Sequence, residues 1–89
     1  MKFTLEDFEF TIVEELEQYE DIDLKYVDDW CETFRKMVKD KKISKKNLKE
    51  ENGTLYFSIE DEMEIFAIVD DYIEAIENNS IPEYWKTFM

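Results

Sequence analysis

The chain has 89 residues and a formal net charge of −13, from 24 acidic and 11 basic side chains. Hydrophobic residues make up 44% of the sequence and aromatic residues 16%, which is enough for one core and argues against disorder. With no histidine, one cysteine and one glycine, the chain cannot supply an imidazole base, a cysteine pair for zinc or a glycine-rich phosphate loop. We expect a single acidic domain over residues 1–89 that has no catalytic residues and binds neither a metal nor a cofactor.

The charges are distributed unevenly along the chain. Residues 1–34 carry a net charge of −10, residues 35–49 carry +7, and residues 50–89 carry −10. In one interpretation the basic segment lies against the acidic helices and neutralises part of their charge. We do not expect direct nucleic-acid binding through residues 35–49, because the segment would act against the field of the whole molecule.

No stretch is apolar and long enough to cross a membrane, which takes about 18 residues or more. The opening MKFTLEDFEF contains acids where a signal peptide needs an uninterrupted apolar run. The sequence therefore predicts a cytoplasmic protein without a membrane partner.

The first predicted helix covers residues 4–20. Thr4 can cap its first turn, Asp7 stands at the capping-box position, and Phe3 and Phe8 form the hydrophobic staple pair. One face of this helix is apolar and consists of Leu5, Phe8, Ile12, Leu16 and Tyr19. The alternation of Phe8, Phe10 and Ile12 would also suit a strand, but the helical face is longer.

Phe10 does not belong to the apolar face of this helix. It projects on the opposite side, among Glu6, Glu14 and Glu17. One interpretation is a contact with another helix. The other is an exposed aromatic anchor ringed by carboxylates, an arrangement typical of interface hot spots.

The second predicted helix covers residues 23–42, with Asp21 or Asp23 as its cap. Its predicted buried face consists of Val27, Cys31, Phe34 and Val38, with Trp30 and Met37 beside it. On this face Cys31 would be a shielded, unreactive thiol. Asp21 and Asp23 alternate like the start of a calcium loop, but the glycine and glutamate that complete such a loop do not follow.

Two structures fit residues 43–57. Asn52-Gly53 is a strong signal for a two-residue hairpin turn, which would place Leu48 opposite Phe57. The alternative is a short helix that Ser44 caps and Gly53 ends. The pattern favours a small hairpin near residues 47–57, packed on the helix that follows.

The third predicted helix covers residues 58–79 and has the widest apolar face in the chain. That face exceeds the ~100° stripe of an ordinary surface helix, which predicts a central helix contacted from at least two sides. Its members are Ile59, Met63, Ile65, Phe66, Ile68, Val69, Tyr72, Ile73 and Ile76. The remaining narrow strip is acidic and holds Glu60, Glu64, Asp71 and Glu74.

Sequence signals also mark both ends of this third helix. Its start, Phe57-Ser58-Ile59-Glu60-Asp61, nearly repeats Phe3-Thr4-Leu5-Glu6-Asp7, because both segments have the pattern of a helix cap. Asn78-Asn79 would end the helix, since asparagine tolerates the left-handed conformation. A short C-terminal helix should then begin at Ser80, with Pro82 in its first turn.

These segments together predict a mainly α fold. It is a compact bundle of three main helices around the central helix 58–79, with a small hairpin near 47–57 and a short C-terminal helix.

Function is predicted from the placement of the acids. A rigid row of carboxylates can replace the phosphates of DNA on a cationic surface, since DNA carries one negative charge per ~1.7 Å. The composition is similar in general character to that of small acidic inhibitors such as phage anti-restriction and anti-CRISPR proteins. We expect a non-enzymatic inhibitor that binds the basic surface of a partner such as a nucleic-acid-binding enzyme. The predicted partner-binding residues are Glu6, Phe10, Glu14, Glu17, Glu60, Glu64, Asp71 and Glu74.

Two other classes fit the same sequence. One is an interaction or scaffold domain that is acidic for solubility, and the other is an immunity protein that neutralises a toxin. An oligomer is compatible with each of the three.

Overall fold

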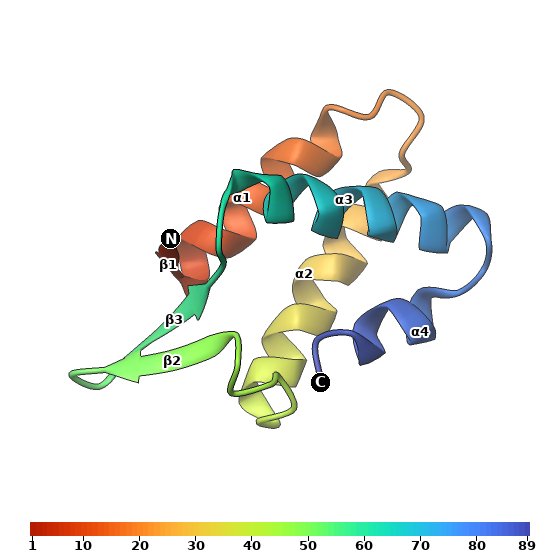
Figure 1. The fold of residues 1–89 in the computed structure, drawn as a ribbon. Helices are drawn as coiled ribbons and strands as arrows, with labels where there is room; N and C mark the ends of the chain where they lie inside the picture. Colours follow the sequence, from red (N-terminus) through yellow and green to blue (C-terminus); the bar gives the residue numbers. More distant parts are fainter.

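Four helices and a small antiparallel sheet make up the fold in the computed structural model, which describes residues 1–89 (Figure 1). The helices are α1 (Leu5–Glu17), α2 (Leu24–Lys39), α3 (Glu62–Glu77) and α4 (Ile81–Lys86). The strands are β1 (Lys2–Thr4), β2 (Leu48–Glu51) and β3 (Thr54–Ser58), in the order β1-β3-β2. The mainly helical prediction is confirmed. The third strand, β1, was missed.

The predicted caps of α1 and α2 are confirmed. The Thr4 hydroxyl accepts a hydrogen bond from the Asp7 backbone N–H at 3.1 Å, and the Asp23 carboxylate accepts one from the Lys25 backbone N–H at 3.0 Å. Phe3 packs on Phe8, with ring centroids 6.3 Å apart, as the staple predicts. The strand alternative for residues 8–12 is therefore wrong.

α2 ends at Lys39, three residues before the predicted Lys42. Lys41 adopts the left-handed conformation (φ 57°), and the Lys42 backbone N–H donates to the Met37 carbonyl at 2.9 Å. This Schellman turn stops the helix although no glycine is present. α3 ends with the same kind of turn, in which Asn79 adopts the left-handed conformation (φ 54°). The prediction that an asparagine ends this helix is therefore confirmed.

The hairpin is confirmed, and the short helix predicted as its alternative is not present. Asn52 and Gly53 both have positive φ, at 51° and 81°, which gives the two-residue turn, and Leu48 pairs with Phe57. The sheet does not pack on α3 as expected. It contacts α1, and Phe57 stacks on Phe8 with ring centroids 4.0 Å apart.

α3 begins at Glu62 rather than at Ser58. Ser58 is the last residue of β3, and its backbone N–H donates to the Asn47 carbonyl at 2.7 Å. The cap is Asp61, whose carboxylate accepts from the Met63 backbone N–H at 2.9 Å. Phe3-Thr4 and Phe57-Ser58, the first two residues of the repeated segments, therefore each end a strand. The two strands pair with each other, and Phe3 lies opposite Phe57.

The core is shared among the elements instead of surrounding α3. The largest fully buried side chains are Trp30, Tyr72, Phe8, Phe34, Phe57, Ile12, Leu16 and Val69. On α3 the buried face is narrower than predicted, because Met63 is 70% exposed and Phe66 is 45% exposed. α3 still has neighbours on two sides, since it contacts α1 and α4.

One hydroxyl group joins three helices inside this core. Tyr84 of α4 accepts a hydrogen bond from the indole N–H of Trp30 in α2 at 3.1 Å and donates one to the Ile68 carbonyl in α3 at 3.0 Å. The protein therefore fixes the position of α4 by polar contacts as well as by apolar packing.

The buried face of α2 differs from the predicted one. Val27, Trp30, Phe34 and Met37 are buried, whereas Cys31 and Val38 are only half-buried. At 100° per residue the inward face is rotated by roughly 50° from the prediction, because both Trp30 and Met37 turn into the core. The prediction that Cys31 is fully shielded is therefore wrong.

Candidate acidic binding site

The two predicted groups of acids lie on different parts of the surface. We call Glu60, Glu64, Asp71 and Glu74 the α3 strip, and Glu6, Phe10, Glu14 and Glu17 the α1 face. Every member of both groups is exposed except Glu64, which is half-buried. No member forms an ion pair.

The α3 strip follows a groove in the surface. Glu60, Glu64 and Asp71 line this groove, which encloses about 520 Å³. It lies between the first half of α3 on one side and the segment before β2 with the C-terminal residues on the other. We call it the α3 groove. Glu74 lies outside it, in an adjoining hollow that it shares with Asp71 and Glu83.

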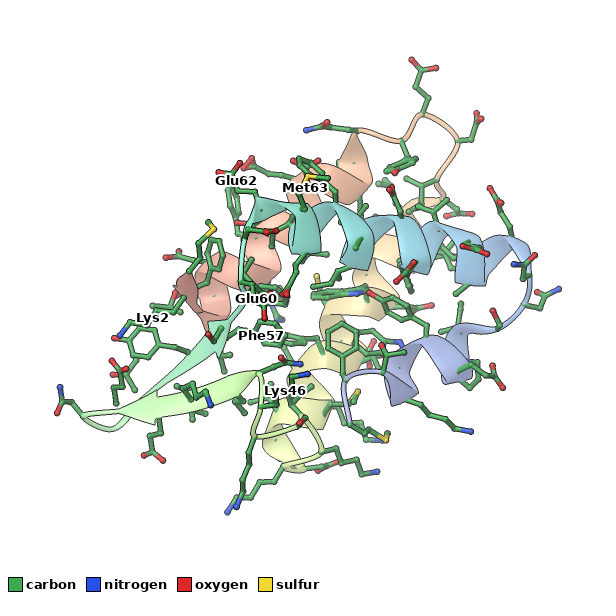
Figure 2. The ribbon with its side chains drawn as sticks, viewed as in Figure 1. Lys2, Lys46, Phe57, Glu60, Glu62 and Met63 are labelled. Carbon is green, nitrogen blue, oxygen red and sulfur yellow. The ribbon has the colours of Figure 1, made fainter.

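The floor and far side of the α3 groove come from distant parts of the chain. The buried rings of Phe57, Tyr84 and Phe88 line it, and Lys46 and Thr87 are among the polar residues that line it away from α3. Figure 2 shows Phe57 between Glu60 and Lys46. The sequence did not predict this groove, because no local pattern places Lys46 near the α3 strip.

Only three of the four acids of the α3 strip lie on the helix itself. Glu60 belongs to the connection between β3 and α3, since the helix begins only at Glu62. Within α3, Glu64 and Glu74 are ten residues apart, or about 15 Å along the axis at 1.5 Å per residue. The strip is therefore a helical row with one additional carboxylate beyond its start.

The α1 face presents an aromatic ring to solvent. Phe10 is 65% exposed, so the interpretation that it contacts another helix of this chain is wrong. Glu6, Glu14 and Glu17 surround it on the same side of α1. A large apolar side chain within a ring of carboxylates is suited to a partner with an apolar contact point and a basic rim.

The basic segment, residues 35–49, forms an ion pair with the acidic helices at one residue, Arg35. The protein has two ion pairs: Lys2 with Glu51, and Arg35 with Glu9 at 2.8 Å. Seven exposed lysines of residues 36–49 have no acidic partner within ion-pair distance: Lys36, Lys39, Lys41, Lys42, Lys45, Lys46 and Lys49. At contact distance the expected neutralisation is therefore limited to Arg35, and charges of both signs remain exposed on the surface.

Glu9 is the one buried acid, and no local sequence pattern predicted its burial. Arg35 covers it, and the hydrogen bond to Glu9 raises the pKa of the guanidinium. Beside it, burial and the neighbouring Glu9 raise the pKa of the Cys31 thiol to about 11. Cys31 is thus protonated at neutral pH, which makes it a poor nucleophile although it is only half-buried.

The protein has no group of three or more potential metal ligands among its cysteine and acidic side chains. None of its helices combines the length and apolar character needed to cross a bilayer.

Comparison with protein-family models, with curated proteins and with solved structures gave no match for this chain.

Proposed function

We propose that this protein is a small non-enzymatic inhibitor that binds a cationic surface of a partner protein, in the manner of a DNA mimic. One observation carries the proposal: all seven acids of the α3 strip and the α1 face are free of ion pairs. A basic partner would therefore not have to displace an internal cation before it binds. The fold contributes a rigid base, because α3 is anchored to the core through Ile65, Val69 and Tyr72.

The partner class follows from the arrangement of the charges. Nucleic-acid-binding enzymes have long basic grooves that accept regularly spaced phosphates. The acids of α3 repeat along one helix and are continued by Glu60, so they offer several negative charges in one row. Complementary charge of this kind accelerates association and selects the partner.

The experiment compares two variants of equal net charge. In the first, Glu60, Glu64, Asp71 and Glu74 are replaced by lysine. In the second, four exposed acids outside both groups are replaced by lysine: Glu20, Asp21, Glu50 and Glu77. Each set changes the net charge from −13 to −5. Binding is measured by biolayer interferometry against a panel of purified restriction enzymes and RNA-guided nucleases, with duplex DNA as a competitor.

The wild-type protein should bind at least one nuclease, duplex DNA should displace it, and its affinity should fall steeply as salt rises. The strip variant should lose this binding, whereas the control variant should retain most of it. A further variant, Phe10→Ala with Glu6, Glu14 and Glu17 changed to glutamine, measures the contribution of the α1 face separately. Undiminished binding of the strip variant would refute the mimic and favour a scaffold domain.

The seven unpaired lysines of residues 36–49 support a second candidate function. In this candidate the protein binds nucleic acid directly through these lysines. The same assay tests it with labelled DNA in place of the nuclease. Binding of DNA that is lost when Lys41, Lys42, Lys45 and Lys46 are neutralised would support this candidate over the mimic.

A further inference from the structure

The α3 groove combines an apolar floor with carboxylates on its α3 side. Glu64 and Asp71 are two helical turns apart on α3, and Glu60 continues the row beyond the helix start. Between the two helical acids, Ala67 and Ile68 line the same groove. The volume of about 520 Å³ lies within the range of ~300–1,000 Å³ that is typical of ligand sites. It exceeds what one side chain needs, so a segment of several residues fits better than a single group.

The groove contains one cation, and it pairs with none of these acids. Lys46 lines the groove opposite the α3 strip and has no carboxylate oxygen within ion-pair distance. Three carboxylates against one ammonium leave the groove negative, inside a molecule whose net charge is −13. A ligand with two positive charges would complement the groove, whereas the three carboxylates would repel an anionic ligand.

We propose that the α3 groove binds an extended, arginine-bearing segment of the partner protein. The proposal rests on the function proposed above and names the part of the partner that would enter this site. The aliphatic stem of an arginine can cover Ala67 and Ile68 while its guanidinium reaches a carboxylate. A guanidinium is more weakly hydrated than an ammonium and pairs with carboxylates in a bidentate geometry, so arginine fits better than lysine.

The spacing of the acids predicts the spacing of the arginines. Glu64 and Asp71 are seven residues apart, or about 10.5 Å along the helix at 1.5 Å per residue. A chain in the extended polyproline II conformation advances about 3.1 Å per residue with three residues per turn, so side chains three residues apart lie on the same face and are separated by about 9 Å. The segment that matches the groove therefore has the pattern Arg-x-x-Arg.

Lys46 makes the proposal distinguishable from general attraction to an acidic protein. It is the only cation that lines the groove, so it repels a positively charged occupant. Its removal should strengthen the binding of an arginine peptide, although a weaker complex is the usual result of truncating a side chain at a binding site. If the groove instead bound an anion, loss of Lys46 would weaken binding.

The test measures fluorescence anisotropy with three labelled 12-residue peptides of equal length. The first carries the Arg-x-x-Arg pattern on an alanine and proline background, which favours the extended polyproline II conformation. The second has the same composition with adjacent arginines, and the third has citrulline, a neutral isostere, in place of arginine. The full chain is titrated into each peptide, and circular dichroism confirms that every variant is folded.

The Arg-x-x-Arg peptide should bind several-fold more tightly than the peptide with adjacent arginines, and the citrulline peptide should not bind. Glu64→Gln combined with Asp71→Asn should weaken binding about tenfold, since each exposed pair accounts for a few-fold effect. The matched control, Glu20→Gln with Asp21→Asn in the exposed connection between α1 and α2, changes the net charge equally and should weaken it less than twofold. Lys46→Ala should tighten it about two- to threefold.

Equal weakening by the control and the groove variants would overturn the groove as the site. The nuclease assay would then decide separately whether the acidic surface still binds a cationic partner. No binding of the Arg-x-x-Arg peptide at low salt would also overturn the groove. Only the absence of nuclease binding as well would remove the proposed function.

Discussion

Tyr84→Phe removes a single oxygen atom from the floor of the α3 groove and tests how the helices are held together. The hydroxyl accepts a hydrogen bond from the Trp30 indole N–H and donates one to the Ile68 carbonyl. Trp30 is completely buried, so in the variant its N–H would have neither a protein partner nor water. The Ile68 carbonyl lies within α3, where the helical ladder supplies another donor.

The expected loss in the free energy of unfolding comes mainly from Trp30, because its N–H loses its partner whereas the Ile68 carbonyl keeps one. A buried donor left without a partner costs ~1–3 kcal/mol, and the carbonyl adds little, so we expect a loss of about 2 kcal/mol. A domain of this length has a total stability of roughly 4–13 kcal/mol at ~0.05–0.15 kcal/mol per residue. The midpoint of thermal unfolding should fall by about 8–16 °C, since 1 kcal/mol corresponds to ~4–8 °C in small domains.

The assay is thermal unfolding followed by circular dichroism, with urea unfolding followed by tryptophan fluorescence. Tyr56→Phe is the matched control, because Tyr56 is only half-buried on β3, and its stability should stay within about 0.5 kcal/mol of wild type. A Tyr84→Phe variant as stable as the control would refute the reasoning. It would show that the indole N–H reaches water and that this hydroxyl does not fix α4.

Four further predictions concern charge, ionisation and the turn. Moderate NaCl should raise the unfolding temperature, because salt screens the repulsion within a chain of net charge −13; a clear fall would contradict this. Burial raises the pKa of the Tyr84 hydroxyl, and it raises the pKa of the Cys31 thiol to about 11. At alkaline pH the folded protein therefore keeps two protons that the unfolded chain releases. Stability should therefore be complete below pH 9 and decline as the pH rises above it, as denaturant titrations at several pH values would show; a gain in stability at alkaline pH would be inconsistent with the buried groups. Native Cys31 should react with a thiol reagent about 100-fold more slowly at pH 8 than an ordinary cysteine, because its thiolate fraction is about 100-fold smaller, and labelling of the unfolded protein gives the reference rate. Gly53→Ala should cost about 1–2 kcal/mol, since Gly53 has φ 81° and no atom lies near an added Cβ, so that only backbone strain acts; an unchanged urea midpoint would mean that the turn can relax.

Local sequence signals predicted the parts of the fold that depend on neighbouring residues. Thr4 and Asp23 cap their helices through backbone groups two or three residues away, and Asn52-Gly53 determines its turn through its own φ angles. Each of these features is decided within about four residues, which is the distance over which caps and turns act.

Contacts between distant residues explain the errors in the predicted fold. Ser58 could serve as a helix cap, yet its pairing with Lys2 makes it part of β3 and moves the start of α3 to Glu62. Trp30 turns inward because its N–H has a partner in Tyr84, 54 residues away. No period in the sequence of α2 distinguishes this face from the one that contains Cys31.

The candidate site was predicted in part for the same reason. Helical periodicity places Phe10 opposite the apolar face of α1 and the acids along one side of α3, and both placements are observed, whereas the exposure of Phe10 was one of two open interpretations. The groove required knowledge of where residues 46, 57 and 84–88 meet α3, and this is decided by packing across the whole chain. The charge of the surface was therefore predictable, but its shape was not.

β1 and β3 pair in the folded protein, but the ribosome synthesises them at different times. Phe8 emerges from the ribosome early, whereas its stacking partner Phe57 follows 49 residues later, or about 2–10 s at ~5–20 residues per second. During that interval the apolar side of α1 has no sheet to cover it, and chains on neighbouring ribosomes could associate through it. The acids on the outer side of α1 give every unfinished chain the same sign of charge, so the charges that would later face a partner also keep nascent chains apart.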